Sequence, residues 1–270
     1  MSKTIHLFDF DETLMVTPAQ LYLTDSRHKK MCELNTEEEV KYNTLINKLG
    51  IKRNYTEYGD NSKISLKRIL EGCYIKYMVK KFNKIAKKGN VGIVTARSMR
   101  ESPYLHEFFK GNSKFKHIKI KQNYIQATGG SKEYEHARKE LKKIPDVAKV
   151  LKHFGIDVNS DSIAIKKNIS VLWFIMVEGY DKVYFYDDNK KNIEYMKALS
   201  AKLPKIMKAL GYPIKVKIET ELVSASRIKK TKSKCKALSK RNKKYLIEKK
   251  NSKCNKFIKS KKKKLWLLIW

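Results

Sequence analysis

Residues 4–14 read Thr-Ile-His-Leu-Phe-Asp-Phe-Asp-Glu-Thr-Leu, a short apolar run followed by two aspartates two positions apart. The run at 5–8 is typical of a buried strand, because a strand covered on both faces carries apolar residues in succession. Asp9 and Asp11 follow directly after this run. The stretch therefore predicts a sheet that presents carboxylates at the carboxyl end of its first strand.

The same arrangement recurs further along the chain. An apolar run at 91–94 ends at Thr95, and another at 183–186 ends at Asp187 and Asp188. Strands alternating with helices predict a Rossmann-like α/β core, a parallel sheet with helices on both faces. Ligands of such sheets bind beyond the carboxyl ends of the strands. Further strands are predicted at 117–120 and 214–218, and helices at 105–110, 133–154 with a break near Pro145, 169–178 and 192–203.

The pattern divides the chain into a core, an insertion and a tail. The core covers 1–225, and an insertion at about 15–88 carries mostly helical patterns. One predicted helix starts at 35–40 behind an N-cap and early acids, and a second amphipathic stretch runs over 69–87. Gly129 and Gly130 are interpreted as a turn. The Lys-rich tail at 226–270 predicts a disordered or loosely helical segment.

The charge balance is strongly basic. Lys and Arg total 61 against 27 Asp and Glu, a net charge of +34, and residues 227–264 hold +18 of it with Glu248 as their one acid. Such a surplus attracts polyanions, so nonspecific nucleic-acid binding through the tail is predicted. The alternative for the core is a lysine-rich coding bias that leaves a solvated surface.

The cysteines and the hydropathy pattern bear on the compartment. Cys32, Cys73, Cys235 and Cys254 include no CxxC pair, so neither a zinc site nor a disulfide scaffold is predicted. We expect free thiols in a reducing, cytoplasmic environment. No signal peptide and no segment long enough to span a bilayer is expected.

Paired carboxylates at a strand end suit phosphoryl chemistry. One carboxylate can attack phosphorus while the other moves a proton, provided that cations neutralise the anionic substrate. Oxygen ligands favour Mg²⁺, and Asp187 and Asp188 supply a further carboxylate for it. A hydroxyl such as that of Thr95 can bind a phosphoryl oxygen, and a lysine such as Lys167 can neutralise the developing charge.

These motifs together resemble those of the haloacid dehalogenase superfamily of phosphatases. Asp9-Phe-Asp11-Glu-Thr13 resembles the first motif, and Thr95 in Ile-Val-Thr-Ala-Arg97 resembles the second. Lys166-Lys167 stands where the third-motif lysine is expected, and Asp187-Asp188 followed by Asn192 resembles the fourth. The similarity covers about residues 4–220. It is greatest to phosphatase-like members of phages and other large DNA viruses, which implies the host cytoplasm.

The resemblance implies a role for each matched residue. Asp9 is expected to form an aspartyl-phosphate, and Asp11 to protonate the leaving group and then activate water. Thr95 and Lys167 are expected to hold the phosphoryl group, with Lys166 as the alternative to Lys167. Mg²⁺ is expected on Asp9, on the backbone carbonyl of Asp11, and on Asp187 or Asp188. Residues expected to contact substrate are Thr13, Thr95, Ala96, Arg97 and Lys166.

Three functions are compatible with these features. The first is a Mg²⁺-dependent phosphatase for a nucleotide or a phosphomonoester at a nucleic-acid end, which combines the motifs with the basic charge. The second is a phosphatase for a small phosphorylated metabolite. The third is a non-catalytic nucleic-acid-binding protein on the same scaffold, with the tail as its anchor.

Overall fold

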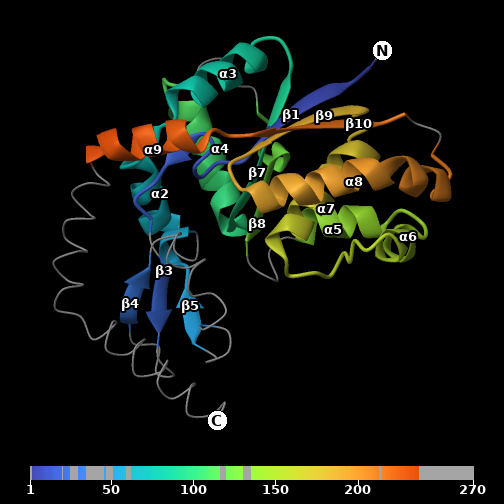
Figure 1. Cartoon of the computed structure of the whole chain (residues 1–270), viewed down its shortest axis with the longest axis horizontal. Coiled ribbons are helices and arrows are strands. Elements are labelled where there is room, and N and C mark those ends of the chain that lie inside the picture. Colours follow the sequence, from blue (N-terminus) through green and yellow to red (C-terminus); the bar gives the residue numbers. More distant parts are fainter. Residues whose placement is uncertain are drawn as a thin grey trace. The chain divides into compact units, whose positions relative to one another are not determined.

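The structure is a computed structural model of the whole chain (Figure 1). It describes residues 2–19, 21–24, 30–34, 46, 51–58, 62–115, 120–129, 135–212 and 215–236. The chain divides into two compact units. The first comprises Met1–Val16 and Cys73–Thr231, and the second comprises Thr17–Gly72 and Lys232–Trp270.

The first unit is built on a five-stranded sheet in the order β10-β9-β1-β7-β8. Every neighbouring pair of these strands is parallel, which confirms the predicted parallel sheet. The order places β1 in the centre, between the two strands that carry the other motifs. The strands are β1 (Thr4–Phe8), β7 (Asn90–Ser98), β8 (Ile125–Gly129), β9 (Lys182–Asp187) and β10 (Lys217–Leu222).

Helices cover both faces of this sheet, as predicted (Figure 1). Alternate residues of β1 point to opposite faces of the sheet. Phe8 packs against Phe82 of α3. Leu7 points to the other face, where the missing side chain of Gly92 leaves room for Leu7 and for Phe174 of α7. One face carries α7 (Ile163–Met176) and α8 (Lys190–Ala209), with α5 (Glu135–Lys142) and α6 (Val147–His153) beside them. The other face carries α3 (Lys76–Ala86) and α4 (Ser102–Gly111). The last described helix is α9 (Ala225–Lys234).

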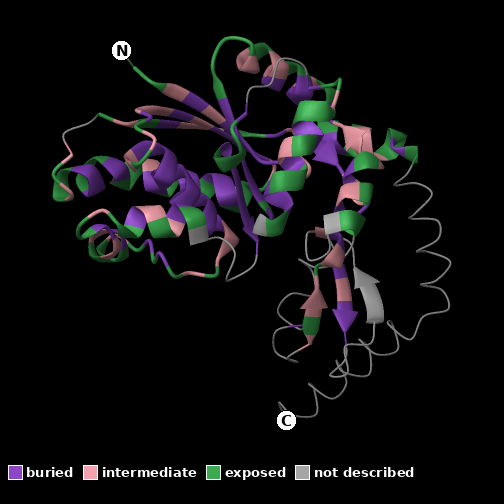
Figure 2. Cartoon of the chain, turned by 180° about the vertical axis from the view of Figure 1, so that it is seen from behind, coloured by how far each residue is buried: buried purple, intermediate pink, exposed green. Residues whose placement is uncertain are grey.

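The core lies where these helices meet the sheet (Figure 2). Helix α7 is buried from Lys166 to Ile175 without interruption, which is typical of a helix that is apolar on all sides. On the opposite face, Phe8, Phe82 and Phe109 form an edge-to-face and stacked aromatic cluster. Both packings hold β1 rigidly, so the loop after Phe8 starts from a fixed point.

The edge strand β8 differs from the prediction. Gly129 is the last residue of β8 and pairs with Ser98, so the interpretation of Gly129 as a turn is wrong. The segment lacks an apolar run because it contains Gln126 and Thr128, although all five of its residues are buried. Residues 117–119 of the predicted strand at 117–120, and Gly130, lie outside the described residues.

The insertion also differs, because its described part contains a sheet. Strands β3 (Leu21–Thr24), β4 (Lys30–Leu34) and β5 (Lys52–Asn54) form an antiparallel sheet in the order β4-β3-β5. The prediction of a mostly helical insertion is therefore wrong for these segments. Leu21 and Leu23 are buried around Tyr22 with the period-two alternation of a half-buried strand, which the helical interpretation overlooked.

The amphipathic helix predicted at the end of the insertion is interrupted. The stretch at 69–87 is divided between α2 (Ser62–Leu70) and α3, with β6 (Cys73–Tyr74) between them. Strand β6 pairs with β2 (Met15–Val16). Short 3-10 helices occupy Thr56–Tyr58, Met99–Glu101 and Gln122–Tyr124. The helix start predicted at 35–40 lies outside the described residues.

The tail and the cysteines complete the comparison. The tail is described only as far as residue 236, and most of that part belongs to helix α9. Cys73 and Cys235 are each in a disulfide, so the prediction of free thiols is wrong for both residues. The side chain of Cys32 and the whole of Cys254 lie outside the described part. Within the described ranges, no helix is long and apolar enough to cross a membrane.

Candidate active site

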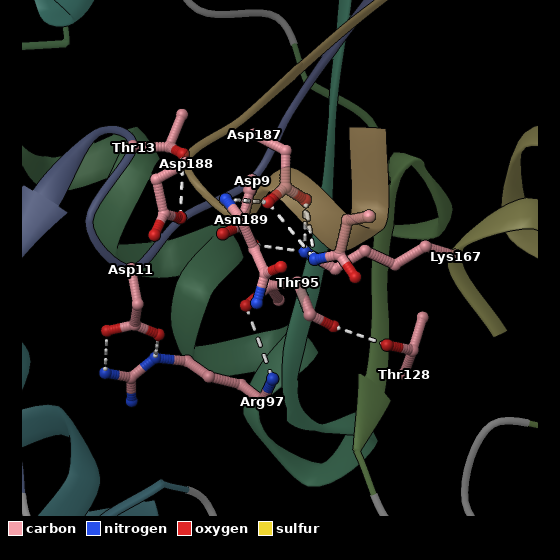
Figure 3. A network of polar contacts seen from close by, with 11 residues as sticks. Asp9, Asp11, Thr13, Thr95, Arg97, Thr128, Lys167, Asp187, Asp188 and Asn189 are labelled. Carbon is pink, nitrogen blue, oxygen red and sulfur yellow. Dashed lines mark hydrogen bonds and ion pairs between the residues drawn. The ribbon is translucent and has the colours of Figure 1, made fainter. Parts of the chain in front are cut away.

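Three adjacent strands bring the predicted carboxylates together. Strand β1 lies between β9 and β7, and the Asp9 amide extends the β1–β9 ladder by donating to the Tyr186 carbonyl at 2.8 Å. The carboxylates of Asp9, Asp187 and Asp188 each place an oxygen within 4.8 Å of the other two (Figure 3). The strand-end reasoning thus found residues that are about 180 positions apart in the chain.

A single buried lysine lies between two of these carboxylates. The Lys167 Nζ is 2.7 Å from Asp187 Oδ2 and 3.0 Å from Asp9 Oδ1 (Figure 3). Its neighbour Lys166 points elsewhere, and its Nζ lies 3.6 Å from Asp161, whose side chain is exposed. The geometry therefore distinguishes two lysines that the sequence left as alternatives.

The two aspartates of the Asp187-Asp188 pair have different surroundings. Asp187 is fully buried and accepts from Lys167, from the Asn189 amide at 2.8 Å, and from Asn192 Nδ2 at 3.1 Å to each oxygen. These contacts occupy the four acceptor positions of its carboxylate. Asp188 receives a longer contact, 3.4 Å, from the Thr13 hydroxyl. Asp188 is the member of the pair with more room for another ligand.

Burial and mutual repulsion dominate the electrostatics of this group. Burial raises the pKa of Asp9 well above its usual range, and the charges of Asp187, Asp188 and Asp11 add to this while Lys167 opposes it. Burial, then the charges of Asp187 and Glu12, raise the pKa of Asp188 to about 7. Burial alone lowers the pKa of Lys167, but Asp187 and Asp9 reverse the effect and raise it. Three carboxylates thus lie close together, and two of them contact the one ammonium group.

A tight loop carries Asp11 away from these carboxylates. Glu12 has a left-handed backbone with φ of 58°, which is uncommon for a residue other than glycine. The turn is closed by the Leu14 amide, which donates to the Phe10 carbonyl at 2.9 Å. Within the same loop Thr13 is fully buried. The turn directs Asp11 and Thr13 to different partners. The predicted role of the Asp11 carbonyl as a metal ligand stays a prediction.

Asp11 meets an arginine from the second motif. Arg97 Nε and Nη2 donate to the two oxygens of Asp11 at 2.7 and 2.8 Å. The Arg97 side chain is fully buried, and its Nη1 is 3.5 Å from Oε2 of Glu101, which is also fully buried. Glu101 was missed by the sequence interpretation, because Arg97 lies on strand β7 and Glu101 in the 3-10 helix that follows, so their spacing carries no helical signal.

The remaining residues of the second motif lie on β7. Thr95 is buried, and its hydroxyl accepts from the Arg97 amide at 3.3 Å. Its carbonyl accepts from the Thr128 hydroxyl at 2.9 Å, so β8 also contributes to the network in Figure 3. Ala96 is exposed, and its carbonyl lies close to Gly129. Thr128 carried no recognisable motif in the sequence.

The chemistry of the donor set fits a divalent cation. Asp9, Asp187 and Asp188 offer carboxylate oxygens at mutual distances that one ion can bridge. Hard oxygen ligands of this kind suit Mg²⁺, which takes one or two carboxylates and retains several waters. The raised pKa values of Asp9 and Asp188 also favour a cation here, because a bound cation would stabilise the charged form of both carboxylates.

Comparison of the chain with protein-family models, with curated proteins and with solved structures finds no match. The resemblance to the haloacid dehalogenase superfamily therefore depends on the motif residues and on their arrangement alone.

Proposed function

We propose that this protein is a Mg²⁺-dependent phosphohydrolase of the haloacid dehalogenase type, acting on a phosphomonoester through an aspartyl-phosphate at Asp9. The observation that carries the proposal is the position of the Lys167 ammonium between Asp9 and Asp187, with Asp188 within reach of both carboxylates. A carboxylate can approach an anionic phosphate only where cations offset the repulsion.

The candidate metal ligands follow from the hydrogen bonds. Asp9 and Asp188 would hold the ion, while Asp187, whose acceptor positions are occupied, orients Lys167 and Asn192. When bound, Mg²⁺ neutralises charge on the phosphoryl oxygens and orients the substrate. The order and spacing of the motifs support this assignment, because both ligands follow neighbouring parallel strands.

The chain's own residues would carry the two chemical steps. The Asp9 carboxylate attacks phosphorus, and the leaving oxygen takes a proton from Asp11 as the ester bond breaks. Asp11 then removes a proton from water, whose oxygen attacks the same phosphorus and releases Asp9 and inorganic phosphate. Lys167 supplies a positive charge beside Asp9, and the buried Thr95 hydroxyl is the candidate donor to a phosphoryl oxygen.

The basic charge of the chain favours a nucleotide or a nucleic-acid end as substrate. A surface with net charge +34 raises the local concentration of polyanions and speeds their association. A small phosphorylated metabolite gains less from this field than a polynucleotide does. The charge therefore supports the class of substrate, and the assignment of the catalytic residues does not depend on it.

A substrate panel tests the proposal. Purified protein with Mg²⁺ is offered nucleoside monophosphates, a phosphorylated oligonucleotide, sugar phosphates and a chromogenic phosphate ester, and phosphate release is measured. We expect turnover, fastest on the nucleotide or oligonucleotide, and loss of at least about a thousandfold in Asp9→Asn. Turnover of the sugar phosphates alone would favour the metabolite phosphatase.

The same assay also tests the alternative of a non-catalytic nucleic-acid-binding protein. Release of phosphate from none of these substrates, with Asp9→Asn equal to wild type, would reject the enzyme. Binding of the oligonucleotide would then be compared with and without residues 237–270. Binding that depends on these residues would support a nucleic-acid-binding protein, and its salt dependence would count the phosphate contacts.

A further inference from the structure

The Asp11–Arg97–Glu101 group forms a buried unit of its own beside the metal-binding carboxylates. Arg97 donates from two nitrogens to both oxygens of Asp11, a bidentate geometry that fixes the plane of the carboxylate. The remaining guanidinium nitrogen, Nη1, lies 3.5 Å from Oε2 of Glu101. Neither Arg97 nor Glu101 has an exposed side chain, whereas the Asp11 side chain keeps 26% of its surface exposed. The Asp11 carboxylate is thus the only partly exposed member of this group of three side chains.

The neighbouring backbone holds Arg97 in place. The pairing of β7 with β8 shifts register between Thr95 and Ser98, where Arg97 lies. Gly129 fits against this irregular segment, since a Cβ there would lie 2.3 Å from the Ala96 carbonyl oxygen and 2.8 Å from the Arg97 carbonyl carbon. The guanidinium also lies 5.3 Å from the ring centroid of Phe10, the residue between Asp9 and Asp11. Strand, loop and ring together leave Arg97 little freedom.

From this geometry we infer that Arg97 is a positioning residue that orients the Asp11 carboxylate towards the leaving group. Glu101 in turn holds the Arg97 guanidinium through Nη1. The inference rests on the proposed function and differs from the expectation that Arg97 contacts substrate. A proton-transfer group is effective only when its carboxylate is held in reach of the reacting oxygen. Arg97 serves here because its planar fork fixes an orientation, which the ammonium of a lysine does not.

A double-mutant cycle between Arg97 and Asp11 separates the two roles. Arg97→Ala is expected to lower kcat about a hundredfold with KM changed less than about threefold, because the interaction acts on proton transfer. In an Asp11→Asn background the same substitution should lower kcat no further than about twofold. A second full hundredfold loss in that background, or a loss expressed mainly in KM, would overturn the inference in favour of substrate contact.

Two further variants guard against misfolding as the cause. Arg97→Lys keeps the positive charge beside Asp11 but loses the fork, so it should fold and show a smaller loss of kcat that also disappears in Asp11→Asn. Lys143→Ala removes a cation outside both the tail and the site, one whose Nζ lies 2.7 Å from Oε1 of Glu140, and should match wild type. An Arg97→Lys enzyme with wild-type kcat would contradict the inference.

An NMR measurement makes the test independent of turnover. In protein labelled with ¹³C at the aspartate side-chain carboxyl, the Asp11 signal is assigned by its loss in Asp11→Asn. We expect this signal to move in Arg97→Ala and to stay in place in Lys143→Ala. An unmoved Asp11 signal would overturn the inference even if the phosphatase is active, and a moved signal in a protein without turnover would reject only the proposed function.

Discussion

Two groups of carboxylates lie side by side at the carboxyl ends of the parallel strands, and they differ in the cation that they contact. In the Asp9 cluster (Asp9, Asp187, Asp188 and Lys167), three carboxylates lie close together and one ammonium group contacts two of them. In the Asp11 cluster (Asp11, Arg97 and Glu101), a guanidinium with fixed directions lies between two carboxylates. The first arrangement leaves negative charge for a cation to neutralise, and the second fixes the orientation of one acid.

The difference gives distinct environments to two aspartates that are only two residues apart. Asp9 is buried among like charges, which raise its pKa together with burial, whereas Asp11 is partly exposed and held by an arginine. Pairs of acids whose surroundings differ are how one site assigns separate roles to chemically identical groups. The predictions below change one cluster at a time and compare the result with the other.

The largest effect is expected from removing the cation of the Asp9 cluster. Lys167→Met leaves Asp9 and Asp187 buried without their shared partner, which should lower the free energy of unfolding by about 3–5 kcal/mol. Lys166→Met is the matched control. Asp161, beside its Nζ, is 81% exposed and stays solvated when the lysine is lost, so the loss should be smaller than in Lys167→Met. Urea unfolding in EDTA measures both, and equal losses would refute the asymmetry of the two lysines.

The next effect is stabilisation by the metal. At a Mg²⁺ concentration a hundred times its dissociation constant, the folded protein should gain about 2.7 kcal/mol, seen as a higher thermal midpoint than in EDTA. Asp188→Asn should lose most of this gain because it removes a ligand, whereas Arg97→Lys should retain it because it leaves the carboxylates of Asp9, Asp187 and Asp188 in place. A full Mg²⁺ effect in Asp188→Asn would exclude Asp188 as a ligand.

A smaller loss is expected at the glycine behind the Asp11 cluster. Gly129→Ala places a methyl group against the Ala96 and Arg97 backbone, and such overpacking should lower the free energy of unfolding by about 1–3 kcal/mol. Gly111→Ala is the control, since nothing lies within 4 Å of a Cβ at that helix position. There alanine should be neutral or stabilise by up to about 1 kcal/mol. Denaturant titration of both variants measures the difference.

The smallest effect, taken per unit of pH, is the pH dependence of the metal-free protein. The folded-state pKa of Asp188, about 7, lies above its ordinary value of 3.8, so between these values the folded protein binds more protons than the unfolded chain. Its contribution to stability therefore increases as pH falls from about 7 towards 4, by at most about 1.4 kcal/mol per pH unit. Unfolding in EDTA at several pH values should show this slope in wild type minus Asp188→Asn. A difference without slope would contradict the origin in Asp188.

Some of this could be predicted from the sequence, and some could not. The central strands β1, β7 and β9 were predictable because buried parallel strands are apolar runs, and their order along the chain predicted that Asp9 and Asp187 would meet. Strand β8 was not, because its polar residues are satisfied by partners distant in sequence, as Thr128 is by Thr95. The sheet of the insertion was overlooked for a different reason, since its strands are short and only Leu21 and Leu23 show the alternation clearly.

The site divides in the same way. Carboxylates that follow strands could be predicted from local sequence, but the direction of a side chain depends on helix phase and on packing. Lys166 and Lys167 differ only in phase along α7, and the geometry around each lysine was needed to tell them apart. The pairing of Arg97 with Asp11 depends on a register irregularity opposite Gly129, which leaves no mark in the sequence.

The central claim, that Asp9 becomes phosphorylated, can be tested by trapping. The enzyme is mixed with Mg²⁺ and its best substrate, quenched in acid, and reduced with borohydride, which converts an aspartyl-phosphate to homoserine. Peptide mass spectrometry should then find homoserine at position 9 in wild type and none in Asp9→Asn, with Asp11 unmodified. Turnover with no homoserine at position 9, or homoserine at Asp11 or Asp188 instead, would contradict Asp9 as the nucleophile.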